Sequence, residues 1–129
     1  MKTKSFLARG TGYFLPPVGG YASEVEARTE GGAVDMRDKP LYSLQQFLAG
    51  EAPYASIAMD VGALPYGTRL IIPHLNVTFG KEIEFRVVDT GEAFRGEKLA
   101  RLDVCCSTRM QSLSTDINRH LYCVAILEG

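Results

Sequence analysis

Residues 82–89 read Glu-Ile-Glu-Phe-Arg-Val-Val-Asp and carry a clear strand signal. Ile83, Phe85 and Val87 alternate with charged residues, so one face of this strand should be buried and the other should meet water. The alternation favours a β-rich fold in which each strand contributes one face to a common core.

The segments on either side of this strand complete a mainly β pattern. Further short strands are predicted at residues 5–13, 56–59, 68–72, 76–79, 101–105 and 122–127, and residues 76–79 should form a hairpin with 82–88. Helices are expected at residues 40–50, with Asp38 as N-cap and Gly50 just past the end, and at 107–119. The Pro and Gly pairs at residues 16–20 predict a loop. Because strands and helices do not alternate, these six or seven short strands predict a small closed β-barrel with short helical insertions.

Length and charge restrict the classes of protein that fit. The chain has 129 residues, the size of one ordinary domain, so residues 1–129 are expected to form a single domain. It carries 14 basic and 15 acidic residues, and a nucleic-acid binder should have a basic excess. No apolar run approaches the roughly 20 residues that span a bilayer, and the apolar stretch after Met1 is too short for a signal-peptide core. We therefore expect neither a nucleic-acid partner nor a membrane span.

The cysteines do not suggest a metal centre. Cys105, Cys106 and Cys123 contain no Cys-x-x-Cys pair, and the two histidines are far apart in sequence, so neither a metal nor another cofactor is expected. One interpretation makes the cysteines small buried hydrophobic residues. The other is a single disulfide from Cys123 to Cys105 or Cys106, and the sequence leaves both open.

Three aspartates lie at positions where a carboxylate is unusual, at the ends of predicted strands or within an apolar run. Asp60 and Asp89 each end a predicted strand, and Asp103 lies inside the apolar run Leu102 to Cys106. A carboxylate in such a place must be paired, hydrogen-bonded or shifted in pKa. One aspartate alone would more often be a structural cap, but three beside glycine-containing turns favour one shared cleft.

Four sequence motifs resemble the three-aspartate domain, a double-psi β-barrel found in lytic transglycosylases of the membrane-bound A type and in related cell-wall proteins. The motifs lie within residues 55–127 and are Ile57-Ala58-Met59-Asp60, Leu64-Pro65-Tyr66-Gly67-Thr68, Asp89-Thr90-Gly91-Glu92-Ala93-Phe94-Arg95-Gly96 and Arg101-Leu102-Asp103-Val104. Their order and spacing agree with the pattern of that family. The resemblance implies a six-stranded double-psi barrel.

The resemblance also implies an activity and a set of site residues. In that family the last aspartate is the catalytic acid, which corresponds to Asp103, and Asp60 and Asp89 would line the cleft in its support. The substrate would be peptidoglycan or a related polysaccharide, which places the chain in the cell envelope or outside the cell, and we expect it to act as a monomer. The candidate substrate-binding residues, which would stack on a sugar, approach it closely or hydrogen-bond it, are Tyr13, Tyr66, Thr68, Thr90, Gly91 and Arg95.

Two other functions remain open at this point. The chain could bind or loosen wall polysaccharide without cutting it, as expansin-like barrels do. Alternatively, it could be a structural barrel in a phage or secretion assembly. The complete absence of Trp disfavours a pure glycan binder, because such proteins stack sugar rings on exposed aromatic rings.

Overall fold

Six strands close into a barrel in the computed structural model, which describes residues 2–14 and 34–127. The loop expected at residues 16–20 lies outside this part of the chain. The barrel order is β1-β5-β2-β4-β3-β6. The strands are β1 (Lys2–Phe14), β2 (Ala55–Ala58), β3 (Thr68–Ile71), β4 (Phe85–Asp89), β5 (Arg101–Cys106) and β6 (His120–Leu127). The expected mainly β fold, a six-stranded closed barrel with short helices, is confirmed.

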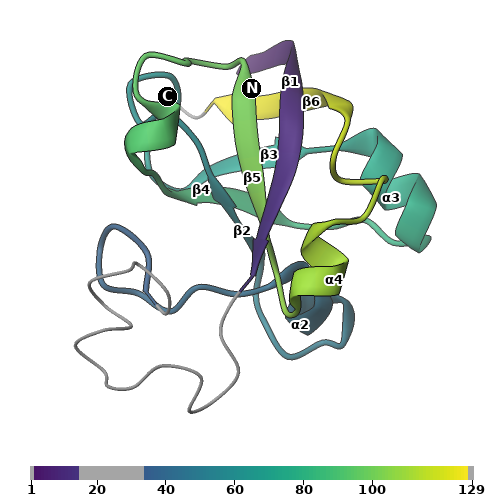
Figure 1. Ribbon diagram of the computed structural model, residues 1–129. Helices are drawn as coiled ribbons and strands as arrows, with labels where there is room; N and C mark the ends of the chain where they lie inside the picture. Colours follow the sequence, from purple (N-terminus) through teal and green to yellow (C-terminus); the bar gives the residue numbers. More distant parts are fainter. Residues whose placement is uncertain (1, 15–33, 128–129) are drawn as a thin grey trace.

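The pairing of the strands sets which segments become neighbours. β1 runs parallel to β5 and β2 runs parallel to β4, whereas the other neighbouring pairs are antiparallel. In Figure 1, β1 and β5 lie side by side although most of the chain separates them in sequence. The N-terminal strand is therefore a structural neighbour of the strand that carries Asp103.

The core fills the inside of the barrel. As the alternation predicted, Ile83, Phe85 and Val87 are buried at 2% exposure or less and belong to this core. A second, smaller cluster lies outside the barrel wall and contains Leu41, Val88 and Cys105, with tyrosines packed against them. The wall next to the second cluster is thus apolar on both sides.

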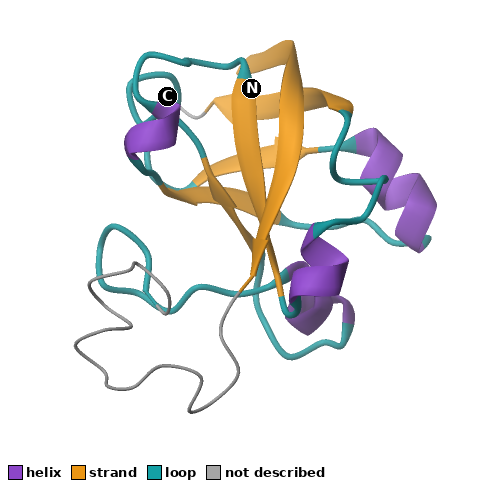
Figure 2. Ribbon diagram, viewed as in Figure 1, coloured by secondary structure: helices purple, strands orange, loops and turns teal. Residues whose placement is uncertain are grey.

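Short helices lie outside the barrel, as Figure 2 shows. They are α2 (Leu44–Leu48), α3 (Pro73–Phe79), α4 (Arg109–Ser112) and the 3-10 helix η1 (Glu92–Phe94). α2 packs on β2 and β5, α3 on β6, and α4 on β1 and β5. Among the described residues, no helix is long and apolar enough to cross a membrane.

The predicted hairpin at residues 76–88 is wrong. Residues 76–79 belong to α3, which has Pro73 in its first turn and Gly80 in the left-handed conformation (φ 63°) after its end. Pro is favoured at the start of a helix and Gly directly after it, and these two signals override the strand preference of Val77 and Thr78. The next strand also starts later than expected, at Phe85.

Both predicted helices are shorter than expected. α2 begins after Ser43, whose side chain forms a capping box with Gln46, so Asp38 is not the N-cap. Gly50 does follow the helix in the left-handed region, at φ 77°, as predicted. In the second segment, Met110 and Leu113 are 84% and 64% exposed and Ile117 alone of the three apolar residues is buried, so the expected apolar face does not form over residues 107–119.

The three cysteines are free and buried, so the disulfide from Cys123 to Cys105 or Cys106 is not formed. Cys106 and Cys123 belong to the core, whereas Cys105 belongs to the outer cluster. The interpretation of these residues as small buried hydrophobic groups is confirmed.

Candidate functional site

One row of residues crosses four neighbouring strands of the barrel. Asp89 on β4 is aligned with Ala58 on β2, which is aligned with Asp103 on β5. Asp103 is aligned in turn with Thr11 on β1. We call these four residues the aspartate row. Its register includes a bulge between Ile57 and Ala58, and such irregularities re-aim side chains near functional sites.

The position of Asp103 follows from strand alternation. Its neighbours Leu102 and Val104 point into the core, so Asp103 lies on the outer face of the barrel, where it is half-buried. The Thr11 hydroxyl donates a hydrogen bond to Asp103 Oδ1. An acid placed this way is held by the next strand and still reaches solvent.

Burial raises the pKa of Asp103 above its ordinary value, although the hydrogen bond from Thr11 and the positive charge of Arg101 both oppose the rise. Two causes could raise the pKa of an aspartate at this position, the apolar strand around it and neighbouring carboxylates. Of these two causes only burial raises the pKa of Asp103 here, and no other carboxylate contributes to the rise.

Asp89 is the more strongly shifted carboxyl group. Burial raises its pKa from 3.8 to about 6, against the hydrogen bond that the Thr90 backbone N–H donates to it, and the charge of Asp35 raises it further. The charges of Asp89 and Asp103 also both help to raise the pKa of Tyr13, after its burial. The two aspartates therefore lie on the same side of the wall, around the outer cluster.

Asp35 is a site residue that the sequence did not indicate. It is only 4% exposed, accepts a hydrogen bond from the Tyr66 hydroxyl at 2.6 Å, and accepts two more from the backbone N–H groups of Arg37 and Lys39. No periodic pattern surrounds it. Asp35 accepts from N–H groups two and four residues further along the chain, as in a common Asp turn. Such turns are frequent in loops, so this local pattern does not mark a functional site.

Asp60 has a different role from the other two aspartates. It is partly exposed, and its two carboxylate oxygens accept hydrogen bonds from the backbone N–H groups of Gly62 and Lys98, each at 2.9 Å. These bonds lower the pKa of Asp60. Asp60 thus joins the loop after β2 to the loop before β5 and remains ionised, which suits a positioning residue.

A hollow of about 410 Å³ opens beside the aspartate row. Several of the predicted site residues line it together, and the full lining is Asp60, Val61, Thr90, Gly91, Glu92 and Arg95. Asp89 directly precedes Thr90, so the hollow begins where β4 ends. Arg95 is largely exposed and lies 3.8 Å from Glu92. The structure therefore brings Asp60, Thr90, Gly91 and Arg95 to one place.

The other three predicted substrate-binding residues do not line this hollow; Tyr66 and Thr68 line a separate hollow of about 210 Å³, and the polar groups of all three residues are engaged or buried within the fold. The Tyr13 hydroxyl is buried and has no hydrogen-bond partner among residues 2–14 and 34–127. Tyr66 has Arg37 over its ring, 4.1 Å from the centroid, in addition to its bond to Asp35. The Thr68 hydroxyl donates to the Pro65 carbonyl at 2.6 Å, which is local backbone capping. Both tyrosines are partly buried against the outer cluster, which limits the ring area that is left for sugar stacking.

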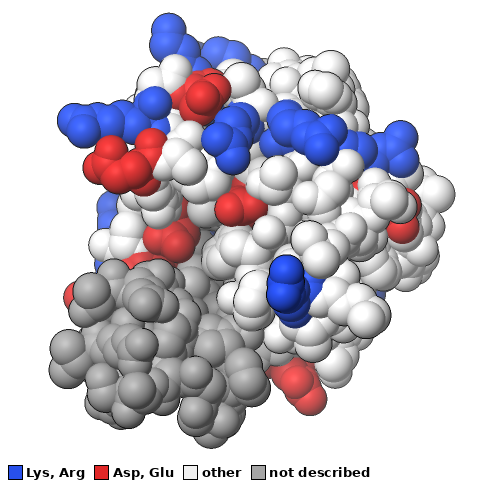
Figure 3. Space-filling model, viewed as in Figure 1, with Lys and Arg blue, Asp and Glu red and all other residues white. Residues whose placement is uncertain are grey.

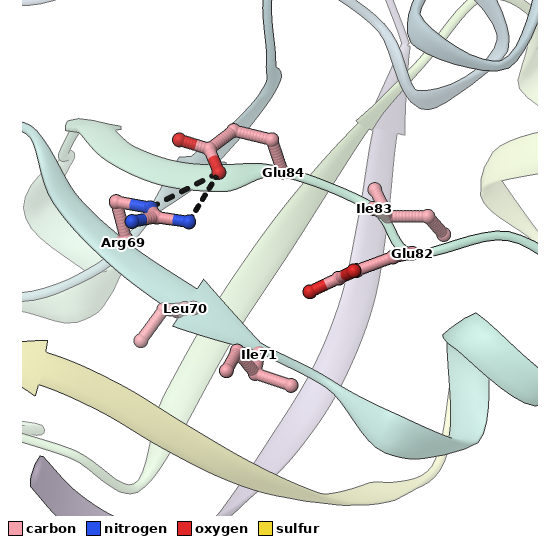
Figure 4. A pocket seen from close by; sticks show the side chains of 6 residues that line it. All are labelled: Arg69, Leu70, Ile71, Glu82, Ile83 and Glu84. Carbon is pink, nitrogen blue, oxygen red and sulfur yellow. Dashed lines mark hydrogen bonds and ion pairs between the residues drawn. The ribbon is translucent and has the colours of Figure 1, made fainter.

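A third hollow, of about 250 Å³, lies on another part of the wall. Figure 4 shows that the Arg69 guanidinium points at Glu84 across it, and Arg69 Nη2 lies 3.0 Å from Glu84 Oε1. Arg86 pairs with the other oxygen of Glu84 at 2.8 Å. Because both oxygens of Glu84 are engaged, this hollow is held by ion pairs, and none of the three aspartates lines it.

No group of three or more metal-binding side chains comes together within the described part of the chain. No protein-family model matches the chain, and no curated protein matches it either.

Proposed function

We propose that this chain cleaves peptidoglycan glycan strands as a lytic transglycosylase, with Asp103 as the single catalytic acid and base. The observation that carries the proposal is a half-buried aspartate with a raised pKa, which accepts a hydrogen bond from Thr11 and lies between the buried Leu102 and Val104 on β5. Asp103 does not itself line the nearby hollow, whose lining includes Asp60 and Thr90. The parallel pairs β1/β5 and β2/β4 within the closed barrel also suit the double-psi interpretation.

The proposed reaction needs one carboxyl group that works twice. Protonated Asp103 gives its proton to the glycosidic oxygen between the muramoyl sugar and the next sugar as that C–O bond breaks. The 6-hydroxyl of the muramoyl sugar then bonds to its own anomeric carbon, and its proton passes to Asp103. The product is a 1,6-anhydro sugar, water is not consumed, and Asp103 is protonated again.

The strand geometry favours this scheme over a retaining glycosidase. Two strand spacings separate the backbones of Asp89 and Asp103, which is about 10 Å. Retaining enzymes hold their two carboxyl groups about 5 Å apart. Asp89 and Asp60 accordingly act as supporting residues that shape and orient the site.

A pure glycan-binding module has less support. Tyr13 is buried and Arg37 covers Tyr66, so both tyrosines that the sequence suggested as stacking platforms are engaged within the fold. The proposed activity would place the protein in the cell envelope or outside the cell.

The test is a digest of purified peptidoglycan with the native chain and with Asp103→Asn, read by mass spectrometry. We expect 1,6-anhydro muropeptides, one water lighter than hydrolysis products, with the native chain and none with the variant. Asp116→Asn, which changes an aspartate paired with His74 away from the site, should cut like the native chain.

Two results would contradict the proposal. Reducing-end products would mean hydrolysis and would direct attention to Asp89 as a second carboxylate. Retention on insoluble wall without any product would leave the glycan-binding function.

A further inference from the structure

A second row of side chains crosses the barrel wall next to the aspartate row. Arg9 on β1 is aligned with Arg101 on β5 and with His120 on β6. The residues next to them, Ala8, Leu102 and Leu121, are buried in the core. Arg9, Arg101 and His120 therefore lie together on the outer face, and we call them the basic row.

Figure 3 shows how basic and acidic side chains are distributed on this side of the molecule. Lys and Arg side chains form a band that crosses the face formed by β1 and β5, and acidic side chains lie just below it. Along β5, Arg101 is two residues from Asp103, and along β1, Arg9 is two residues from Thr11. The basic row and the aspartate row are therefore about 7 Å apart.

The fold does not explain why Arg9 and Arg101 are adjacent. Like charges directly opposite each other on neighbouring strands destabilise a sheet. Arg9 is exposed and has no acidic partner within the described residues. Arg101 donates a hydrogen bond to the Ala93 carbonyl at 3.3 Å and lies 5.5 Å from the centre of the Phe94 ring. Its charge also acts on Asp103, whose pKa it lowers, so of the two arginines Arg9 is the one without an acidic neighbour among the described residues.

We infer that the basic row binds a carboxylate group of the glycan and so makes the site selective for acidic glycans over neutral ones. This inference rests on the proposed function, because it gives the substrate of the same site. Guanidinium groups bind carboxylates through paired N–H donors, and Arg9 has its donors free for this contact. A carboxylate bound there lies beside Asp103, so the contact would set the position of the chain that Asp103 cuts.

The experiment measures binding apart from cutting. Asp103→Asn protein is sedimented with insoluble peptidoglycan that has free carboxyl groups and with the same material after carbodiimide amidation. We expect amidation to weaken binding about tenfold, as for the loss of a charge-assisted hydrogen bond. Adding Arg9→Gln should cause a similar loss and make binding insensitive to amidation. Arg9 is chosen because, unlike Arg101, it is not among the groups that shift the pKa of Asp103.

Arg109→Gln is the matched control, since it removes an exposed Arg from α4 and should leave binding unchanged. Equal binding to both materials, no effect of Arg9→Gln, or no binding at all would overturn the inference. Because only binding is measured, a chain that binds acidic wall without cutting it would refute the proposed function and leave this inference intact.

Discussion

Thr11 is the residue of the neighbouring strand that affects the pKa of Asp103 directly. Its hydroxyl comes from the neighbouring strand and stabilises the ionised form of the carboxyl group, which lowers the pKa of Asp103 against the effect of burial. In the proposed reaction Asp103 must be protonated when it meets its substrate, so this contact would set the pH above which the reaction slows.

Replacing Thr11 with Val removes the hydroxyl and keeps the shape. The pKa of Asp103 should rise, so the fall in cutting rate at high pH should move to higher pH. The lost hydrogen bond should cost about 1 kcal/mol of stability. The rate of anhydro-product formation against pH checks this, and Thr11→Ser should keep the native profile. An unchanged profile in Thr11→Val would show that the hydroxyl does not act on the catalytic group.

Asp89 makes the stability of the folded chain depend on pH. Because its pKa is raised from 3.8 to about 6, the folded state binds the proton more tightly than the unfolded state does. The stabilising contribution is complete below pH 3.8, is lost as the pH rises to about 6, and stays lost above that. We expect a loss of about 1 kcal/mol, since the half-exposed group is partly screened by solvent.

Denaturant unfolding of the native chain and of Asp89→Asn at pH 4 and pH 7 measures this contribution. The variant should lack this part of the pH dependence, and its gain in stability over the native chain should be larger at pH 7. Equal differences between the two proteins at both pH values would mean that the pKa of Asp89 is not raised.

The contact between β1 and α4 depends on close approach of two backbones. A Cβ on Gly12 would lie 2.4 Å from the Ser112 carbonyl oxygen and 2.7 Å from the Ser112 Cα. These are backbone atoms, so they cannot move aside as the end of a flexible side chain can. Gly12 follows Thr11 directly, so this packing also holds the strand that positions Asp103.

Gly12→Ala should therefore destabilise the fold by about 1–3 kcal/mol. Gly91→Ala is the matched change, because its added Cβ would meet only the Phe94 ring, at 3.8 Å. Thermal unfolding of the two variants should show a clearly lower midpoint for Gly12→Ala alone. If both variants unfold like the native chain, β1 and α4 do not pack as closely as described.

Packing inside the barrel and in the outer cluster makes the three thiols unreactive toward thiol reagents in the folded chain. Burial raises the pKa of Cys106 and of Cys123 to about 12 each, and it raises the pKa of Cys105 as well. A thiol needs its thiolate form and access to react, and the folded chain provides neither.

An aromatic disulfide reagent should accordingly label none of the three cysteines in the native chain and all three in denaturant. Rapid labelling of the native chain would indicate that the wall opens near β5 or β6. Full labelling in denaturant without a reductant also checks that no disulfide is present.

Sequence alone went furthest where the signal is local. Alternation along residues 82–89 and the positions of the other strands predicted a small closed β-barrel, since a strand that forms a wall must bury every second residue. It also marked Asp60, Asp89 and Asp103 as carboxylates at strand ends or within an apolar run. At residues 76–79 two local signals compete. Pro73 at the start and Gly80 after the end of the helix outweigh the strand preference of the residues between them.

Only the tertiary structure decided which of these residues meet. Thr11 lies 92 residues from Asp103 in the chain and touches it because β1 runs parallel to β5. The same pairing creates the basic row, and the packing outside the barrel buries Tyr13 and brings Asp35 to the site. Neighbours across strands depend on register between distant segments, and no pattern within one segment contains that information.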